Sequence, residues 1–472
     1  MLCGAVVVAA SSQSQATTFI LGRVVDSQTR APIAFAVVEL ITPNVRPPSK
    51  ATDQQGQFVF RDVKDGSYRL VVNAPGYRRA EYQGGIKRLE VSAKPIGDIE
   101  IRLEKLGSIH GRAVGPGGEP MAGVRVTAYD LASPFADPGA PESRTDDRGA
   151  YVIGNLIPGR YIVGAHFWTV VTSPSPGARQ NSKAIQIGND TFVPGQDYAI
   201  GSSAVARADN GRAIVRRSAF ATRATSPGTA EVVTIGVGEN HLGADLTIET
   251  AVATTVSGRV MATPESGSAF TVRLLFSEAA GPSPVVLSIA ETRTDAAGQF
   301  RLIGVPAGNY TIGVDAVPPP RAPGAARRGE PAGRAAAPPA PPPPPPPVYF
   351  ARQPIVVPES GVNDVTVAVR TGLTIRGRLM IDPASANEPN APKTINFNGP
   401  RVGISGGTLN APVSDAGTFT MTNLSPGGYS FFVDGSRGWH ISSIRAGNTR
   451  IDGLLQLTGD LSGLTIVISK RK

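Results

Sequence analysis

Few side chains in this sequence could do acid–base, nucleophilic or metal-binding chemistry. The 472 residues include four His and one Cys. None of them has the spacing of a zinc site, such as His-Glu-x-x-His or paired Cys-x-x-Cys. We therefore predict no catalytic residue, no metal site and no cofactor, and expect a protein that is not an enzyme. An enzyme would need a pocket where His, Asp and Arg from different loops converge.

The two Trp residues are the candidate ligand-binding side chains. Trp168 ends the sequence Ala-His-Phe-Trp, and Trp439 is followed by a His. An exposed indole ring could stack on a sugar ring, whereas a Trp half-buried in a sheet would only pack against its neighbours. Trp168 and Trp439 are therefore predicted as carbohydrate-binding residues if their rings face solvent.

Four Asp residues recur at the same place in a repeated pattern: Asp53, Asp146, Asp295 and Asp415. Their oxygens would suit calcium, but the surrounding carboxylates are too sparse for an ion that takes six or more oxygen ligands. Asp followed by Gly between a Thr or Ser and an aromatic residue is typical of a turn, because Asp can accept from its own downstream backbone N–H. We favour the turn interpretation.

The pattern around these Asp residues occurs four times. Its first copy is Thr52-Asp-Gln-Gln-Gly-Gln-Phe58, followed by Gly66-Ser-Tyr68, and the others are Thr145–Tyr151 with Tyr161, Thr294–Phe300 with Tyr310, and Ser414–Phe419 with Tyr429. Asp and Tyr are 15 residues apart in three copies and 14 apart in the last. We expect one turn residue to be missing there. The chain thus contains four copies of one module.

A Gly-Arg strand precedes each copy, and an apolar strand closes each module. The Gly-Arg strands are residues 20–24, 109–113, 256–260 and 375–379, and the closing strands begin at Asp98, Asp245, Asp364 and Gly463. Alternation places the first, third and fifth residues of each Gly-Arg strand on one face, which we predict to be the core. We expect the repeated Arg to have a folding role, by pairing with a carboxylate or covering a strand edge.

These signals favour an all-β chain, because short Val-, Ile- and Thr-rich runs alternate with Gly and Pro turns. We predict four tandem transthyretin-like or immunoglobulin-like β-sandwich modules, at residues 17–104, 105–250, 251–371 and 372–472. Module two carries a long insertion, whose Arg-rich residues 201–230 would form a basic loop or an extra hairpin, with a binding site as the less favoured alternative. Module three carries Pro318–Pro347, which should loop out as polyproline II or disordered chain, because Pro has no amide donor. The short spacing between modules favours an extended, fairly stiff chain.

The beginning of the sequence indicates export. Residues 1–16 are apolar and then rich in small residues, and we interpret them as the remnant of a secretory signal that lacks its basic start. Cys3 is the only Cys, so no intrachain disulfide can form. No apolar stretch approaches the about 20 residues of a membrane-spanning helix. We predict a protein that is secreted, periplasmic or associated with the cell envelope.

The charge says less about partners. The net charge is +9, which would suit anionic surface polymers or membranes, although an Arg-rich solvated surface is the simpler explanation. The sequence has no helix-turn-helix, zinc-finger or aromatic RNA-binding signature, so we predict no nucleic-acid partner. Polysaccharides or cell-surface proteins remain as candidate partners, and the oligomeric state is left open.

The succession of Gly-Arg-Val, Pro32-Ile-Ala-Phe-Ala-Val-Val-Glu-Leu40, Thr-Asp-x-x-Gly-x-Phe and Gly-x-Tyr resembles the carboxypeptidase regulatory-like domain. That family has a transthyretin-like β-sandwich. Module one matches nearly throughout, module two matches over Gly111–Tyr161, and modules three and four match at the landmarks but differ in loop lengths. The family accompanies peptidases, outer-membrane receptors and stand-alone surface proteins, so the resemblance implies a fold rather than an activity.

Two functions fit these observations. The first is a non-enzymatic, secreted or cell-envelope array of β-sandwich modules that acts in adhesion, in scaffolding or as a spacer. The alternative is a carbohydrate-binding protein that uses exposed aromatic residues on the modules, for which Trp168 and Trp439 are the candidates. An exposed Trp surface would distinguish the second from the first.

Overall fold

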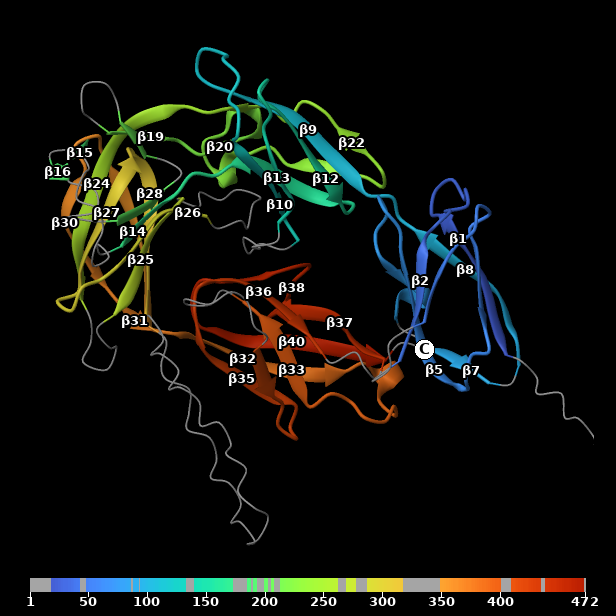
Figure 1. The fold of residues 1–472 in the computed structure, drawn as a ribbon. Coiled ribbons are helices and arrows are strands. Elements are labelled where there is room, and N and C mark those ends of the chain that lie inside the picture. Colours follow the sequence, from blue (N-terminus) through green and yellow to red (C-terminus); the bar gives the residue numbers. More distant parts are fainter. Residues whose placement is uncertain are drawn as a thin grey trace, which may run out of the picture. The chain divides into compact units, whose positions relative to one another are not determined.

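The computed structural model describes residues 18–42, 48–85, 88–92, 94–132, 140–172, 185–187, 190–192, 199–202, 205–207, 213–261, 269–276, 287–316, 349–399, 409–433 and 438–470. The predicted signal remnant 1–16 and the proline-rich segment 318–347 lie outside these residues. In the described chain nearly all regular structure is β-strand, which confirms the all-β prediction (Figure 1). The short 3-10 turns are η1 (Tyr82–Gly85), η2 (Ala221–Arg223), η3 (Pro227–Thr229) and η4 (Pro383–Ser385). No helix in these ranges is long and apolar enough to cross a membrane.

The chain divides into two compact units. One contains the residues up to 109 together with 153–159 and 234–242, and the other contains the rest of the chain. Modules three and four lie wholly in the second unit, which also contains the part of module two that carries the insertion. The site described below is built entirely from residues of this second unit.

In every module the Gly-Arg strand is a central strand of one sheet. These strands are β1 (Phe19–Asp26), β9 (Gly107–Val114), β24 (Thr250–Met261) and β32 (Leu373–Ile381). Each pairs with the strand of the turn motif, which is β4 (Gln57–Arg61), β12 (Ala150–Leu156), β27 (Gln299–Pro306) or β35 (Thr418–Leu424). Each also pairs in parallel with closing strands, which are β8 (Ile96–Leu103), β22 (Asn240–His241) with β23 (Leu246–Thr247), β30 (Val362–Ala368) and β40 (Leu461–Lys470). First and last strands of a module thus lie side by side, and the chain between them must cross to another sheet.

The second sheet of each module contains the strands between these two. In module one they are β3 (Ser49–Ala51), β2 (Val37–Ile41), β5 (Gly66–Asn73), β6 (Ala80–Glu81) and β7 (Leu89–Val91). In module two they are β11 (Glu142–Arg144), β10 (Arg125–Asp130), β13 (Gly159–Ala165), β20 (Ala219–Phe220) and β21 (Val233–Ile235). In module three they are β26 (Ser288–Arg293), β25 (Phe270–Phe276), β28 (Gly308–Ala316) and β29 (Tyr349–Val357). In module four they are β34 (Leu409–Pro412), β33 (Thr394–Asn398), β36 (Gly427–Phe432) and β39 (Leu455–Leu457), while β37 (Trp439–Ala446) and β38 (Thr449–Arg450) extend the first sheet.

The Gly-Arg strands present the predicted face to the core. Ile20, Ile109, Val256 and Ile375 are all fully buried. The glycine between the apolar residues is required by close packing, because a Cβ on Gly22 would overlap the Phe58 ring and the carbonyl of Ile99. A Cβ on Gly377 would likewise overlap Phe419 and the carbonyl of Leu464. The aromatic residue of the turn motif and the closing strand therefore meet at this glycine.

The repeated Asp residues stabilise turns. Asp53 Oδ1 accepts from the backbone N–H of Gln55 and Gln57, at 2.9 and 2.8 Å. Asp146 and Asp295 make the same two bonds, to the residues two and four positions later. Each carboxylate thus satisfies two donors of its own turn, as the turn interpretation expects.

The fourth copy is not shortened, contrary to the sequence alignment. Ser414 occupies the Asp position there, because its N–H donates to the carbonyl of Thr418 and its Oγ accepts from Thr418 N at 3.1 Å. From Ser414 to Tyr429 the distance is the same 15 residues as in the other copies. Asp415 is therefore an exposed turn residue, and its Oδ1 lies 3.4 Å from Nζ of Lys393. Serine hides the true register because it bonds the turn as Asp does but more weakly.

The Tyr residues of the repeat also stabilise turns. Tyr68, Tyr310 and Tyr429 each donate a hydroxyl hydrogen bond to the carbonyl four residues earlier, at 2.9, 2.9 and 2.7 Å. These bonds close the Gly-containing turn that precedes each Tyr, in the manner of the tyrosine corner of immunoglobulin-like sandwiches.

The Arg after each repeated glycine lies on the exposed face of its strand. Arg112 donates to the carbonyl of Arg148 and Arg259 to the carbonyl of Ala297, both at 3.1 Å. These carbonyls belong to the Asp turns, so in modules two and three the Arg supports the turn. The bonds fit the expected folding role, but the acceptor is a backbone carbonyl rather than a carboxylate.

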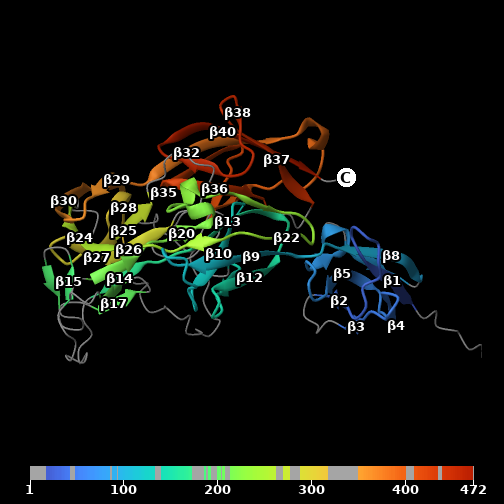
Figure 2. The same ribbon diagram turned by 90° about the horizontal axis from the view of Figure 1, so that it is seen from above.

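The insertion of module two joins both sheets of module three. β14 (Thr169–Thr172) pairs with β26 of module three and with β17 (Ala199–Ser202), as Figures 1 and 2 show. β19 (Ala213–Arg216) pairs with the first residues of β24 and with β18 (Val205–Arg207). A separate hairpin is formed by β15 (Ile185–Ile187) and β16 (Asp190–Phe192). The expectation of an extra hairpin is thus correct for β18 and β19, but this hairpin belongs to the sheet of the next module.

These strands share a core with module three. Ile187, Ala213 and Val215 from the insertion pack with Ala253 and Ile303, and all five are buried. Phe220 and Ile162 of module two form another cluster with Leu287. Modules two and three are therefore joined by sheet hydrogen bonds and by apolar contacts, rather than by a linker.

Modules three and four are joined in a similar way. β31 (Arg370–Thr371), which precedes the first strand of module four, pairs with β29 of module three. Phe350 of β29 is fully buried in the core of module four, and Arg370 lies over its ring at 4.9 Å. A residue of one module thus completes the core of the next.

Candidate functional site

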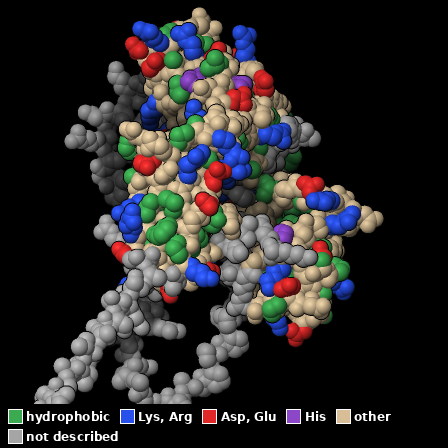
Figure 3. Space-filling model, turned by 90° about the vertical axis from the view of Figure 1, so that its right-hand side faces the viewer, with side chains coloured by type: hydrophobic (Ala, Val, Ile, Leu, Met, Phe, Trp, Pro, Cys, Tyr) green, Lys and Arg blue, Asp and Glu red, His purple; other side chains and the backbone are tan. Residues whose placement is uncertain are grey.

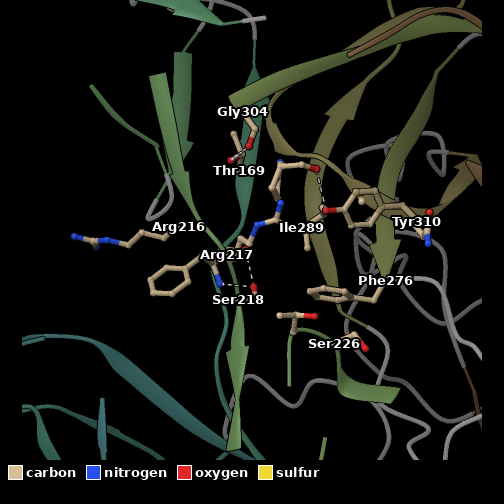
Figure 4. A pocket seen from close by; sticks show the side chains of 14 residues that line it. Thr169, Arg216, Arg217, Ser218, Ser226, Phe276, Ile289, Gly304 and Tyr310 are labelled. Carbon is tan, nitrogen blue, oxygen red and sulfur yellow. Dashed lines mark hydrogen bonds between the residues drawn. The ribbon is translucent and has the colours of Figure 1, made fainter. Parts of the chain in front are cut away.

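A cavity of about 300 Å³ lies where the insertion of module two meets module three. One wall comes from the end of β19 and the segment after it, with Arg216, Arg217 and Ser226. The other comes from β25, β27 and β28, with Phe276 and Tyr310 (Figure 4). The cavity exists because strands of two modules share sheets around it.

Two adjacent Arg residues have different orientations at this cavity. Figure 4 shows Arg217 pointing between the walls toward Tyr310, while Arg216 points away. The guanidinium of Arg216 lies 5.9 Å from the centre of the Phe167 ring. Within the described part of the chain, no carboxylate pairs with either guanidinium. Arg217 therefore brings a positive charge into the cavity that the described residues leave uncompensated.

Backbone and hydroxyl bonds fix the walls. Ser218 accepts from Phe167 N at 3.0 Å and donates to Phe167 O at 3.2 Å, which ties the two segments of the insertion together. Arg217 N donates to the carbonyl of Glu249 at 2.8 Å. Burial raises the pKa of Tyr310 to about 12, so its hydroxyl stays protonated and donates to Pro306.

Trp168 lies in the chain between Phe167 and Thr169, which both line this cavity. Its side chain is 38% exposed and its ring stacks on His166, with ring centres 5.7 Å apart and planes at 21°. His166 Nε2 lies 3.1 Å from the carbonyl of Ser288 in module three, and burial lowers the His166 pKa to about 4. The neutral imidazole therefore holds the indole in place and leaves part of it open to solvent.

Trp439 is placed differently. It is 2% exposed and belongs to the core of module four. Its Nε1 is buried without a hydrogen-bond partner among the described residues. A sugar cannot stack on this ring in the folded protein, so the predicted carbohydrate role for Trp439 is not compatible with its position. Trp439 is the first residue of strand β37, so it lies in a sheet and not in the turn before it.

A buried ion-pair cluster in module three shows the contrasting arrangement. Asp315 is buried, and Arg273 and Arg352 lie 3.0 and 3.1 Å from its two oxygens. In the described ranges no group of three or more His, Cys, Asp or Glu side chains could hold a metal ion. Figure 3 shows basic and acidic side chains interspersed over the face in view. Arg217 therefore differs from these Arg residues, because it has no carboxylate partner in the described chain.

Sequence reasoning missed most of this site. Arg216 and Arg217 fall in the basic segment 201–230, for which the sequence favours a loop or hairpin over a binding site. The sequence pattern predicts Phe276 and Tyr310 only as core residues of module three. The pairing of β19 with β24 joins two modules, and no local sequence pattern predicts it. The adjacent Arg pair after an apolar strand was the one signal that could have indicated the site.

Comparisons with known proteins agree with the fold of module one. The model of the carboxypeptidase regulatory-like domain matches residues 20–104, so the resemblance is confirmed there. No curated protein matches the sequence.

Several solved structures are similar at low identity. The TIE protein of Bacillus anthracis is 11% identical, with 98% of this chain and 76% of that chain covered and a TM-score of 0.19. A minor pilin of Streptococcus agalactiae is 14% identical, with 49% and 95% covered and a TM-score of 0.22. Two B repeat units of the collagen binding protein of Staphylococcus aureus are 11% identical, with 96% and 100% covered and a TM-score of 0.15.

Proposed function

We propose that this chain is a non-enzymatic protein of the cell surface or envelope that acts in adhesion, in scaffolding or as a spacer. The observation that carries the proposal is the interlocking of modules two, three and four by shared sheets and a shared core residue. Such joints transmit load along the chain, because separating two modules would break sheet hydrogen bonds and expose buried apolar side chains.

The recurrent polar residues support the same role. The turn Asp, the corner Tyr and the Arg after glycine all bond to backbone groups of their own module. These residues recur from module to module and stabilise the fold, while the loops differ in length. The absence of a metal-ligand group in the described chain fits this role without testing it.

Labelling of intact cells tests the proposal. Antibodies raised against purified residues 18–472 should bind cells that make the protein before they are permeabilised, and Fab fragments should reduce attachment of these cells to surfaces. Labelling that appears only after the cells are lysed would contradict the proposal. An antibody against a cytoplasmic enzyme of the same cells is the control for intactness.

Carbohydrate binding is a second candidate function, and Trp168 is the observation that favours it. Its ring is partly exposed and is held by stacking on His166. We expect Trp168→Ala to weaken binding of the protein to immobilised polysaccharides, measured against a panel of neutral and acidic polymers. Trp439 should have no direct role, so binding that is lost only through a Trp439 variant with intact folding would contradict this candidate.

A further inference from the structure

The cavity beside Arg217 has the composition of a small-ligand site. Its described lining contains two Arg residues and no Asp or Glu. Arg217 is partly buried, and no carboxylate in the described chain pairs with it. A guanidinium in a partly desolvated position attracts an anion more strongly than one in water, because the effective dielectric constant is lower.

The other walls favour a ligand with hydroxyl groups and an apolar face. The side chains of Thr225, Ser226 and Asn309 line the cavity and can exchange hydrogen bonds with hydroxyls. Phe276 offers a partly exposed ring, and its position is supported by Tyr310, with ring centres 6.5 Å apart. The rings provide apolar contact while the Arg and amide groups set orientation, which is the usual division of roles in a small-molecule site.

Size and rigidity restrict the ligand further. A volume of about 300 Å³ is at the lower end of the range for ligand pockets, which suits one or two sugar rings and excludes a folded peptide. The main chain on both sides of the Arg217 side chain is fixed by the bonds of Arg217 N to Glu249 and of Ser218 to Phe167. Little ordering is therefore needed when a ligand enters.

We propose that this cavity binds an acidic saccharide, in which Arg217 pairs with the carboxylate of a uronic acid unit and Phe276 contacts the sugar ring. Trp168, near the same joint, would contact an adjoining unit of a longer chain. This inference goes beyond the adhesion or spacer role, because that role requires no small-ligand site. The binding unit is the joint of modules two and three, and neither module contains the site alone.

Calorimetric titration of the full chain with trigalacturonate tests the proposal. We expect saturable binding of one ligand per chain at physiological ionic strength, weakened about tenfold or more by Arg217→Gln, because a hydrogen bond to a charged group is lost. Arg217→Lys should give an intermediate loss, since Lys keeps the charge but lacks the planar fork of donors. Arg376→Gln is the matched control, because Arg376 is an exposed strand residue of module four and the same charge is removed.

Other ligands separate the possible outcomes. Maltotriose should bind at least tenfold more weakly than trigalacturonate, and acetate and inorganic phosphate should not compete at equal concentration. The proposal is overturned if trigalacturonate does not bind, if Arg376→Gln weakens binding as much as Arg217→Gln, or if phosphate binds more tightly than the sugar acid. Unfolding curves of Arg217→Gln and Arg217→Lys that match the unmodified chain show that any loss is local. Failure of this test leaves the surface-labelling result unaffected.

Discussion

At the scale of single residues, the repeated glycine shows why a short motif specifies a fold. In modules one and four this glycine faces the aromatic ring of the turn motif and a carbonyl of the closing strand. Three strands therefore meet at a point that has no room for a methyl group. The Gly, the aromatic residue and the closing strand recur together because each is sterically required by the others.

Gly377→Ala should destabilise module four by about 1–3 kcal/mol, the usual cost of overpacking a core. The added methyl would overlap Phe419 and the carbonyl of Leu464. Urea unfolding followed by the fluorescence of buried Trp439, in a Trp168→Phe background, measures the loss. Gly459→Ala is the control, because nothing lies within 4 Å of its added Cβ. Equal stability of the two variants would show that the close approach does not exist in solution.

His166 should make the joint of modules two and three sensitive to acid. Its folded pKa is lowered from 6.5 to about 4, so the unfolded chain binds the proton more readily. Its contribution to stability is therefore fully present above pH 6.5 and is lost as the pH falls toward 4, by up to roughly 3 kcal/mol. His166→Phe, which cannot be protonated, should flatten this pH dependence in urea unfolding followed by Trp168 fluorescence in a Trp439→Phe background. A slope that is unchanged in the variant would assign the effect to other groups.

At the scale of elements, the strands β14 and β19 matter more to module three than to module two. Both lie within the sequence of module two, yet β14 pairs with β26 and β19 with β24. One edge of each sheet in module three is thereby covered by strands from the sequence of module two. Covered edges also reduce pairing with other molecules, which is the general hazard of an exposed strand.

Val215→Asp should therefore destabilise module three, although Val215 lies in the sequence of module two. Val215 is fully buried against Ala253 and Ile303, and a buried unpaired carboxylate should cost about 3 kcal/mol or more. The control is Val152→Asp, because Val152 lies on the exposed face of strand β12 and is 52% exposed. Hydrogen exchange of β24 and β27 measures the effect. Exchange that is unchanged there, but faster in β10 and β13, would assign β19 to module two instead.

At the scale of the whole molecule, modules two, three and four share strands and cores. Residues 251–371 alone would lack β14, β17, β18 and β19 and would expose Ala253, Ile303 and the edge of β24. Residues 105–371 keep these contacts. The extended, stiff chain inferred from the short spacing between modules stays a prediction, which scattering in solution can test.

We expect residues 105–371 to unfold in one calorimetric transition, and residues 251–371 alone to fold poorly or to melt at a clearly lower temperature. The physical reason is that the shared sheets and cores couple the two modules. Residues 17–104, which contain the matched regulatory-like domain, serve as an isolated-module control. A fragment 251–371 with the same melting temperature as 105–371 would show that the inserted strands contribute nothing to module three.

The sequence by itself determined the all-β class, the four copies and the residues that build each copy. This was possible because the landmarks act locally: Asp53 bonds its own turn, Tyr68 bonds four residues back, and Gly22 touches strands of its own module. Local signals fail where a different side chain can make the same hydrogen bond, as Ser414 does in place of Asp. The repeat spacing then reports the wrong register.

Only the tertiary structure decided where the insertion lies, which Trp is exposed and which residues share a cavity. Strand β14 pairs with β26 in the register Thr169↔Ala290, far along the chain, whereas β19 pairs with the nearer β24 in the register Ile214↔Val252. Alternation alone cannot choose between two sheets that both offer an open edge. Trp168 and Trp439 have similar sequence surroundings, but packing buries one ring and leaves the other partly open. Arg217 meets Tyr310 because two modules share their sheets, and that sharing is a property of the assembled fold.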